Sequence, residues 1–502
     1  MQFPGDFEQA TDSRLWAPKD GAVSFSYSDG EPTEQYLIGC LGSARDLSTG
    51  SEELGRCIRD WPTLYHLSPL RANLLRPIDF SQVSTILELG AGCGALTRYM
   101  GELGKEVIAV EGSFPRAKIG CLRTAGLENV QFVATPFQDV SFPSKFDMVT
   151  MVGTLEYSAK YIGGENPYGQ ALALAKSFLK PDGVLVLAIE NRLGSKYFQG
   201  CGEDHTGIPY DGLEGYPSGA EACTFGEPEL RQLLARSGYP HAKFLYPYPD
   251  YKLPRAMLFE PGVPDSSSEP FIYQWLGSGK PLDYSGLAVP ETFDPFLLNK
   301  HLEINSLLGA MANSFLVLAG SEDGSTEPFL PSGRVLEQYL NWPGGACGKE
   351  GVHQSEDGYF RFSTHEAEGD KPLVVGESLL ERMVCALKSK KGDPHFSFGE
   401  ELRAWFAYLE ALSESDSGDP FLQGDDYDRI PSNLVYNQEG VLEPFRTGVC
   451  LPSRIPMETV INRGLILLWK DYRHLLEPLF PGGISPCEDT WVTMAKETFG
   501  LQ

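Results

Sequence analysis

The segment that most constrains the fold is an apolar strand that runs directly into a glycine-rich turn. Thr85–Leu89 has the character of a buried strand, Gly90-Ala91-Gly92-Cys93-Gly94 follows, and Ala95–Leu103 has a helical pattern. Glycines in such a turn adopt positive φ and let the backbone approach a ligand closely. The helix that follows offers free N–H donors at its N-terminus. The segment therefore predicts a ligand-binding turn in a parallel α/β sheet.

The residues around this turn alternate short apolar runs with helical segments, which is typical of a parallel sheet. The expected strands are Thr85–Leu89, Glu106–Val110, Val130–Ala134, Phe146–Val152 and Val184–Ile189, and the expected helices include Ala95–Leu103 and Tyr168–Leu179. Lys243–Tyr246 and Ala256–Phe259 could close the sheet as a hairpin. The predicted fold class is α/β, with a Rossmann-like, doubly wound, mostly parallel sheet.

The chain has 502 residues, which exceeds the size at which a single core stops growing, about 250–300 residues. We expect an N-terminal lead-in at residues 1–80 that covers the site, a cofactor-binding domain at 81–262, and an additional α+β domain at 270–502. Pro261–Ser268 has the composition of a linker. Helical patterns recur in the third region, at Phe398–Leu412 and Met457–Leu468.

Composition limits the partners of the chain. Its 41 Lys and Arg residues stand against 68 Asp and Glu residues, for a net charge of −27. Such a surface repels phosphate backbones and anionic lipids, so we expect no nucleic-acid partner. No window approaches the roughly 20 apolar residues that span a bilayer, and the start lacks the features of a secretory signal. We therefore expect no membrane insertion and a cytoplasmic location. The ten cysteines include no Cys-x-x-Cys pair, so reduced thiols and no metal site are expected.

Two acids near the turn bear on which cofactor it holds. Gly90, Gly92 and Ala95 also fit the glycine pattern of nicotinamide enzymes, so a dinucleotide is one alternative and a turn without a ligand is another. Glu88 stands two residues before the first glycine. It would repel a pyrophosphate, but it would attract the cationic sulfonium and ammonium groups of S-adenosylmethionine. Glu111 lies about 20 residues further on, where an acid binds ribose hydroxyls with either cofactor. Glu88 therefore favours S-adenosylmethionine.

The same residues carry a family resemblance. Leu87-Glu88-Leu89-Gly90-Ala91-Gly92-Cys93-Gly94 resembles the first motif of class I S-adenosylmethionine-dependent methyltransferases, and the segment from Phe146 to Tyr157 resembles their fourth-strand motif. A narrower resemblance is to a bacterial methyltransferase family whose members accompany glycosyltransferases and surface-polysaccharide genes. It rests on Trp61–Pro77, Ile189–Gly194, Glu203–Gly207 and Tyr248–Pro254, and it covers residues 20 to 260 well and the rest loosely.

The resemblance implies a set of cofactor contacts. In the family, the segment after the third strand packs on the adenine, the end of the fourth strand lines the methionine moiety, and the segment before the first strand covers the donor. The expected cofactor-binding residues are Tyr65, Glu88, Gly90, Ala91, Gly92, Gly94, Glu111, Gly112, Thr135, Pro136, Phe137, Gly153 and Thr154. An acid that is common after the third strand is missing here, because Thr135 stands near its place. Gln138 or Asp139 could substitute for it.

The acceptor chemistry is expected in the long loop of residues 190–223, because ligands bind at the carboxyl ends of parallel strands and long loops often act as lids. An acceptor alcohol must lose a proton, and a carboxylate can tune an imidazole as the base. His205 is the predicted base, with Asp204 or Glu203 as its orienting partner. A solvated turn is the alternative reading of this cluster. His66 is the second candidate, unless it contacts the cofactor or only packs.

The third region contains a second motif. Asp428 and Asn433 have the Asp-x-x-x-x-Asn spacing of a kinase catalytic loop, and Val375–Leu379 resembles a hinge segment of small-molecule kinases. The metal-binding acid expected after the loop is absent, and no glycine-rich phosphate loop is apparent upstream. We expect a degenerate kinase-like domain, or an unrelated acceptor or oligomerisation domain. A homodimer remains open.

The sequence thus predicts an enzyme that transfers a methyl group from S-adenosylmethionine to a hydroxyl of a saccharide or a similar hydroxylated small molecule. The expected partner is a small-molecule or glycan acceptor. The alternatives are a natural-product N- or O-methyltransferase and a non-catalytic scaffold that keeps the cofactor fold. Pro247–Lys252 combines aromatic rings with charged groups, which fits a sugar-binding surface or an ordinary turn, and the turn is favoured.

Overall fold

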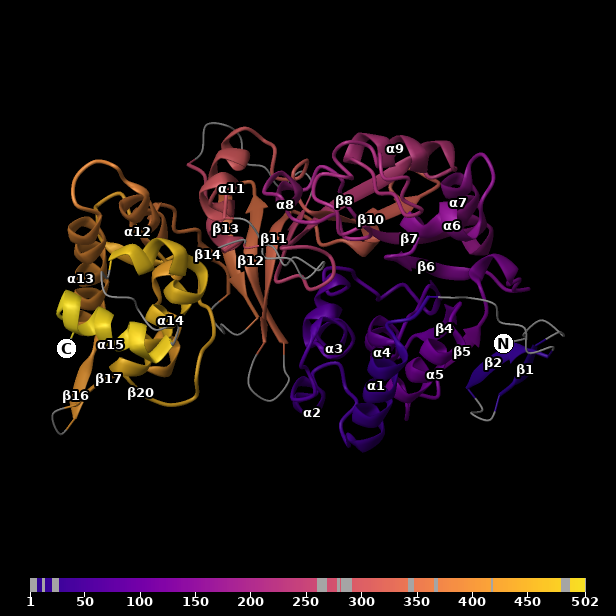
Figure 1. Ribbon diagram of the computed structural model, residues 1–502, viewed down its shortest axis with the longest axis horizontal. Coiled ribbons are helices and arrows are strands. Elements are labelled where there is room, and N and C mark those ends of the chain that lie inside the picture. Colours follow the sequence, from indigo (N-terminus) through magenta and orange to yellow (C-terminus); the bar gives the residue numbers. More distant parts are fainter. Residues whose placement is uncertain are drawn as a thin grey trace.

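One long sheet organises the molecule. The computed structural model describes residues 7–10, 14–19, 27–259, 269–277, 280, 291–341, 347–364, 369–416, 419–479 and 488–501. Within them, a sheet of 14 strands extends from the N-terminal region toward the C-terminal domain (Figure 1). No described helix combines the length and apolar character that crossing a bilayer requires.

The centre of the sheet is parallel, as predicted. Its strands lie in the order β5-β4-β3-β6-β7, and each pairs in parallel with its neighbours. They are β3 (Thr85–Leu89), β4 (Glu106–Glu111), β5 (Val130–Ala134), β6 (Phe146–Val152) and β7 (Leu179–Glu190). All five predicted strands are therefore confirmed. The carboxyl ends of β3, β4, β6 and β7 meet at one edge, where a ligand of a doubly wound fold binds.

Helices cover both faces of this parallel centre, because each strand is apolar on both sides. Ile86 packs with the apolar residues of α4 (Ala95–Glu102) and α5 (Phe114–Arg123). Leu87, the next residue, packs on the other face with α7 (Pro167–Phe178) and α9 (Glu227–Arg236). Figure 1 shows the two layers, α4 and α5 below the strands and α7 and α9 above them. The predicted α/β fold class is confirmed.

The next strand in space comes from a distant part of the chain. β10 (Ser314–Gly320) lies between β7 and β8 (His241–Tyr248) and is antiparallel to both. β8 and β9 (Ala256–Phe259) form the predicted hairpin. Residues 314–320, which come after the expected domain boundary near residue 262, therefore belong to the same sheet. The linker expected at Pro261–Ser268 lies outside the described residues.

The N-terminal lead-in packs on the cofactor side of the sheet. β1 (Phe7–Gln9) pairs with β2 (Leu15–Pro18), and β2 pairs in parallel with β5. The helices α1 (Glu31–Ser43), α2 (Glu52–Gly55) and α3 (Trp61–Leu67) follow. Apolar residues of α1 and α3 pack against Ile119 of α5, and a 3₁₀ helix at Pro69–Leu74 leads to β3. The remaining short helices of this half are α6 (Ser158–Tyr161) and α8 (Ser195–Phe198).

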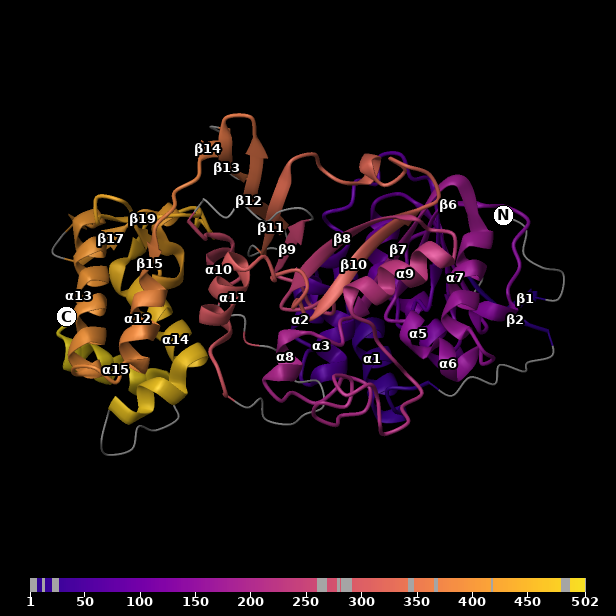
Figure 2. The same ribbon diagram turned by 90° about the horizontal axis from the view of Figure 1, so that it is seen from above.

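The sheet continues as antiparallel strands toward the C-terminal domain. They are β11 (Arg334–Asn341), β12 (Cys347–Ser355), β13 (Gly358–Ser363) and β14 (Lys371–Pro372), with α10 (Ile272–Trp275) and α11 (Pro295–Ile304) beside them. Figure 2 shows these elements between the two ends of the molecule.

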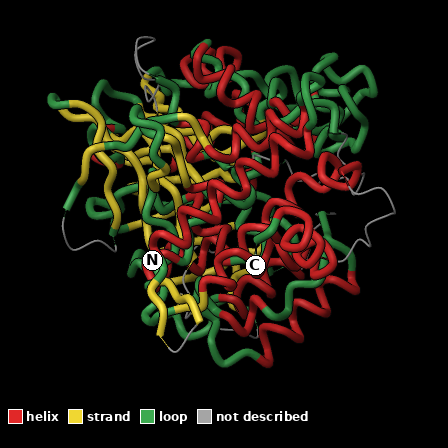
Figure 3. The backbone as a smooth tube through the Cα atoms, turned by 90° about the vertical axis from the view of Figure 1, so that its left-hand side faces the viewer, coloured by secondary structure: helices red, strands yellow, loops and turns green. Residues whose placement is uncertain are grey.

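The C-terminal domain has its own core of α12 (Leu379–Lys388), α13 (Pro394–Leu412), α14 (Met457–Leu476) and α15 (Glu488–Phe499). Two small antiparallel sheets accompany them: β15 (Glu377–Ser378) with β18 (Leu434–Tyr436) and β19 (Leu442–Pro444), and β16 (Glu414–Asp416) with β17 (Asp419–Leu422) and β20 (Ile455–Pro456). Figure 3 looks onto this end, where helices lie beside the strands. The region is α+β, as predicted.

Asp428 and Asn433, the two residues with the kinase-like spacing, make local contacts within this domain. Asn433 Nδ2 donates to the backbone oxygen of Asp428 at 2.8 Å. The Asp428 carboxylate accepts from Arg463 Nη2 at 2.6 Å and from the Val449 backbone N–H at 2.7 Å. Both side chains are buried, so Asp428 and Asn433 make internal contacts that stabilise the C-terminal domain.

Candidate active site

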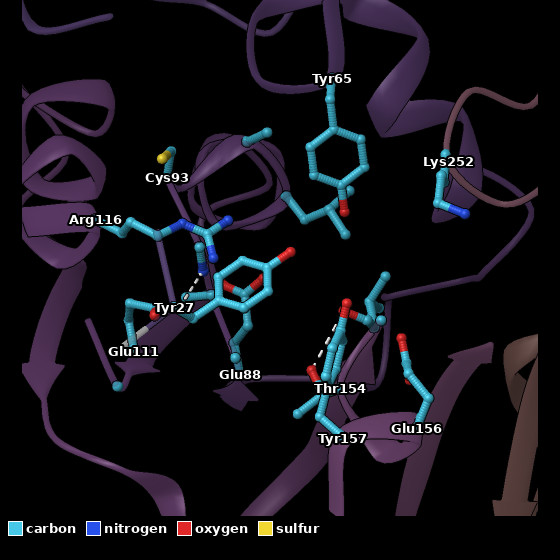
Figure 4. Close-up of a pocket in the computed structure, with 18 of the residues that line it drawn as sticks. Tyr27, Tyr65, Glu88, Cys93, Glu111, Arg116, Thr154, Glu156, Tyr157 and Lys252 are labelled. Carbon is cyan, nitrogen blue, oxygen red and sulfur yellow. Dashed lines mark hydrogen bonds between the residues drawn. The ribbon is translucent and has the colours of Figure 1, made fainter. Parts of the chain in front are cut away.

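A cavity of about 250 Å³ opens at the carboxyl ends of the parallel strands. Figure 4 shows its two ends, with Glu111, Cys93 and Arg116 on one side and Glu156 and Lys252 on the other. Glu88 lies between them at its base. The cavity is therefore built from the glycine turn at one end and from the loops after β6 and β7 at the other.

The glycine turn has the backbone that the sequence predicts. Gly90, Gly92 and Gly94 all have positive φ, at 83°, 57° and 81°. A Cβ at Gly90 would lie 2.4 Å from Thr154 Oγ1, and one at Gly94 would lie 2.9 Å from the Cα of Gly120. Gly90 and Gly92 line the cavity, whereas Gly94 lies outside the lining and permits close packing of α4 on α5.

Glu111 fixes this turn from the end of β4. Its Oε2 accepts from the Gly92 backbone N–H at 2.7 Å, and its Oε1 accepts from the Ser113 N–H at 2.9 Å. Each carboxylate oxygen can accept a second hydrogen bond, and Glu111 lines the cavity. Its carboxylate can therefore bind a pair of ribose hydroxyls while it holds the turn, which fits the predicted cofactor.

Glu88 is buried at the base of the cavity, where its Oε2 accepts a hydrogen bond from Thr97 Oγ1. Burial raises the pKa of Glu88 to about 8, although the hydrogen bond from Thr97 and the charge of Arg71 oppose this shift. A cation in the cavity would favour the ionised carboxylate. The residue thus suits a ligand with a sulfonium and an ammonium group.

Most of the predicted cofactor residues meet in this cavity. Those that line it are Tyr65, Glu88, Gly90, Ala91, Gly92, Glu111, Gly112, Pro136, Phe137, Gly153 and Thr154. Gly94 and Thr135 do not line it. Thr135 is buried, and its backbone N–H donates to the backbone oxygen of Glu111. Gln138, one of the two expected substitutes for the missing acid, does line the cavity, and Asp139 does not.

The predicted acceptor residues lie at the opposite end. His205 Nδ1 donates to Glu203 Oε1 at 2.9 Å, and Glu203 also accepts from the backbone N–H groups of His205 and Thr206. Of the two expected partners, Glu203 is therefore the one that is hydrogen-bonded to the His205 ring. Asp204 instead accepts from Lys196 Nζ at 2.6 Å and from Lys252 Nζ at 2.5 Å. His205 and Asp204 line the cavity, and Glu203 supports them from behind.

Without a bound cation, the carboxylates around His205 favour its protonated form. Burial favours the neutral ring, but the negative charges of Glu190 and Glu156 and the hydrogen bond to Glu203 raise the pKa of His205 well above the usual value. An imidazolium cannot accept another proton. Burial also raises the pKa of Glu156, against the effect of His205. The geometry thus favours a carboxylate of this cluster, with His205 holding it in place, as the group that takes a proton.

His66 belongs to the cofactor end. Its Nε2 lies 3.0 Å from Asp29 Oδ2, and it lines the cavity beside Cys93 and Arg116. Burial would lower the pKa of His66, but Cys93 and the hydrogen bond to Asp29 raise it to about 9. A histidine protonated at neutral pH in this position is suited to contact with the cofactor rather than to proton abstraction.

Several site residues were not predicted, among them Glu156, Glu190, Arg116, Tyr157 and Lys252, which all line the cavity. The loop at Pro247–Lys252 contains a turn, since Asp250 Oδ1 accepts from the Lys252 backbone N–H at 2.9 Å. It also brings Lys252 to the cavity, so the favoured turn is present, and a role of this segment in binding a sugar stays a prediction. Glu190 is the last residue of β7, and this position at the end of a parallel strand could have identified it as a site residue.

Replacing Glu88 by Gln is expected to weaken S-adenosylmethionine binding by about 10-fold or more, because a charged hydrogen-bonding partner contributes about 1.5–3 kcal/mol. Binding of S-adenosylhomocysteine, whose sulfur carries no charge, should be weakened less.

The raised pKa of Glu88 also affects stability. Between about pH 4.5 and 8, unfolded chains bind fewer protons than folded ones, so the free energy of unfolding of the wild-type chain falls as the pH rises through this window. Glu88→Gln should flatten that fall in urea unfolding. Equal losses for both ligands, or a pH profile like that of the exposed control Glu106→Gln, would argue against this role.

One family comparison concerns the part of the chain that contains the glycine turn. A family model described as a methyltransferase domain matches residues 87–187. No curated protein matches the chain. The CcbJ methyltransferase of Streptomyces caelestis is 14% identical, with 55% of this chain and 98% of that chain covered and a TM-score of 0.29.

Two further solved structures contain S-adenosylhomocysteine. The 1,6-didemethyltoxoflavin-N1-methyltransferase of Burkholderia thailandensis is 22% identical, over 41% of this chain and 76% of that chain, with a TM-score of 0.23. The N-methyltransferase NodS of Bradyrhizobium japonicum is 23% identical, over 32% and 74%, with a TM-score of 0.22. At such low scores these structures do not bear on the acceptor.

The family match covers the glycine turn, all of β4, β5 and β6, and the greater part of β3 and β7. The same segment supplies Glu88 at the base of the cavity and Glu111 at one of its ends. The chain is an S-adenosylmethionine-dependent methyltransferase, with residues 87–187 in its methyltransferase domain.

Proposed function

We propose that this methyltransferase acts on a hydroxyl group of a polar small molecule, and that a saccharide or glycan is its acceptor. The observation that carries the proposal is the acceptor end of the cavity. Glu156 and Glu190 line it together with His205, and both carboxylates are buried. An alcohol must lose its proton as it is methylated, and these carboxylates can take it.

The cofactor, when bound, supplies an activated methyl group, and the residues of the chain position and deprotonate the acceptor. As the acceptor oxygen takes the methyl group that the cofactor would supply, the Glu156 carboxylate takes the hydroxyl proton, and S-adenosylhomocysteine would be the leaving group. His205 is a positioning residue, because its ring lies between Glu156 and Glu203. Alignment of donor and acceptor provides much of the rate increase.

The walls of the cavity are suited to a sugar ring. Aromatic side chains line it from several elements, namely Tyr27, Trp61, Tyr65, Tyr157, Tyr161 and Tyr251. Aromatic faces pack against the C–H faces of a ring, while carboxylates accept its hydroxyl hydrogens. This mixture, with the sequence resemblance to methyltransferases that accompany glycosyltransferases, supports a saccharide as acceptor and a role in polysaccharide biosynthesis.

Product analysis tests the proposal. The full chain is incubated with S-adenosylmethionine and a panel of nucleotide sugars, methyl glycosides and their amino-sugar counterparts, and products are fragmented by mass spectrometry. The expected product has gained about 14 mass units on a sugar oxygen. Methylation of amino groups alone would replace the proposal by N-methylation. Absence of any product from a protein that binds the cofactor would favour the scaffold alternative.

A further inference from the structure

Three ligand-type side chains converge at the acceptor end of the cavity. One ligand atom from each of Glu156, Glu190 and His205 lies within 4.8 Å of the other two. His205 Nε2 is 3.8 Å from Glu156 Oε1 and 3.9 Å from Glu190 Oε2. Both distances exceed those of hydrogen bonds. The three atoms therefore face a common gap.

Two oxygens of this cluster have unused hydrogen-bonding capacity. Glu156 Oε2 and Glu190 Oε2 have no hydrogen-bond partner in the described part of the chain, and both residues are only 1% exposed. The other oxygen of Glu190 accepts from Lys252 Nζ and, at 3.3 Å, from Tyr251 Oη. Buried carboxylate oxygens without partners are costly, so they indicate a missing ligand.

The histidine is oriented as a metal ligand is. Its Nδ1 donates to Glu203 Oε1, which leaves Nε2 to face the gap. Glu203 is fixed in turn by the His205 and Thr206 backbone N–H groups and by Tyr216 Oη at 3.2 Å. A carboxylate on the far nitrogen is the usual support of a metal-bound histidine. Nε2 is therefore presented in one defined direction.

The local charges leave room for a cation. Four buried carboxylates lie in or beside this cluster, from Glu156, Glu190, Glu203 and Asp204. Two ammonium groups pair with some of them: Lys196 with Asp204, and Lys252 with both Asp204 and Glu190. A histidine that binds a metal ion through Nε2 must give up the proton on that nitrogen. With His205 neutral in this way, four negative charges against two positive ones leave two negative charges. A divalent cation would balance them.

The geometry points to a divalent cation bound by Glu156, Glu190 and His205, which holds the acceptor hydroxyl in the active site. Ligand atoms each about 2.0–2.2 Å from one cation are at most about 4.4 Å apart, and the two measured nitrogen–oxygen distances satisfy this limit. Two carboxylates and one imidazole without a thiolate suit a cation such as Mn²⁺ or Mg²⁺. This differs from the absence of a metal site that the cysteine spacing predicts.

The cation would lower the pKa of the bound hydroxyl. The proton would leave to the remaining oxygen of Glu156, and the acceptor oxygen would then attack the methyl carbon as the carbon–sulfur bond breaks. The inference rests on the proposed function for the identity of this acceptor group, but the cation site itself can be tested without it.

A second cluster, Asp29, His66 and Cys93, has a comparable set of ligand atoms, yet it differs in two respects. His66 Nε2 is already hydrogen-bonded to Asp29 at 3.0 Å, and Arg116 Nε lies 3.5 Å from the same Asp29 oxygen. A guanidinium in this place repels a metal ion. This cluster therefore provides a natural control.

The test is titration of the chelator-treated full chain with MnCl₂, followed by calorimetry and by the loss of the free Mn²⁺ signal in electron paramagnetic resonance. We expect one site per chain. Its affinity should fall about 30-fold or more in Glu156→Gln and His205→Asn, and about 10–100-fold in Glu203→Gln, which disturbs the support of His205. Asp29→Asn should leave Mn²⁺ affinity unchanged. Retained S-adenosylhomocysteine binding identifies the variants that are folded.

Absence of saturable Mn²⁺ binding up to about 1 mM, the weak limit of useful protein sites, would overturn the inference. So would wild-type affinity in the folded Glu156→Gln and His205→Asn variants, or a loss of affinity confined to Asp29→Asn. Saturable Mn²⁺ binding in a chain that methylates only amines would contradict the proposed function and support the cation site. Methylation of sugars without Mn²⁺ binding would support the proposed function and contradict the cation site.

Discussion

Replacing Glu156 by Gln is expected to lower kcat for methyl transfer by about 100- to 10,000-fold, the range over which general bases act. The amide is similar in shape but cannot accept the acceptor proton. Because Glu156 lies at the end of the cavity away from Glu111 and Arg116 (Figure 4), the affinity for S-adenosylmethionine should change less than about threefold, well under 1 kcal/mol. Steady-state kinetics with calorimetry on the same preparations measure both quantities.

The pH profile separates proton transfer from a general structural effect. Burial raises the pKa of Glu156, so wild-type kcat should rise with pH as this carboxyl ionises, and the variant should lose that limb. The exposed Glu52→Gln in α2 serves as the control. A variant that keeps the wild-type profile with reduced kcat, or that loses cofactor affinity in proportion to rate, would remove Glu156 from the proposed role.

Asp204→Asn is expected to destabilise the fold by about 3–5 kcal/mol, the usual cost of removing one partner from a buried ion pair. Asp204 is 3% exposed and Lys196 is 1% exposed, and Lys252 Nζ binds the same carboxylate. The substitution leaves both ammonium groups in the protein without this anion. Urea unfolding at neutral pH measures the loss.

The effect should depend on pH in a defined direction. Lys196 and Lys252 hold the pKa of Asp204 far below its usual value of 3.8, although burial opposes them. Stabilisation by this carboxylate is therefore complete above about pH 4 and disappears as the pH falls through the folded-state pKa. Glu458→Gln removes the 71% exposed partner of Lys496 and should cost at most about 1 kcal/mol. A comparable small cost for Asp204→Asn would show that the buried network does not stabilise the fold.

Sequence patterns were sufficient for the parts of the site that follow from local structure. The five parallel strands have apolar runs bounded by turns, and the glycine turn predicts its own positive φ values. Glu88 and Glu111 could be placed because they lie beside strand ends whose positions the pattern defines. Parallel strands bring those ends together, so the cofactor end of the cavity was largely predictable.

The acceptor end depends on contacts between distant segments. Glu190 meets Lys252 across 62 residues, and Asp204 meets the same lysine across 48. The strand β10 enters the sheet from residues 314–320, and its own apolar pattern does not specify which neighbours it pairs with. The sequence left Asp204 and Glu203 open as partners of His205, because neighbouring residues in a loop can point in different directions. In the structure, Glu203 is the one that is hydrogen-bonded to the ring.

The central claim is tested most directly by calorimetric titration of S-adenosylmethionine, S-adenosylhomocysteine and NAD into the wild-type chain and Glu111→Ala. Glu111 holds the turn through the Gly92 N–H and lines the cavity. We expect micromolar affinity for both adenosyl ligands, a loss of about 100-fold or more in the variant, and no NAD binding. Binding of NAD alone would contradict the account, because Glu88 would then face a pyrophosphate that it should repel.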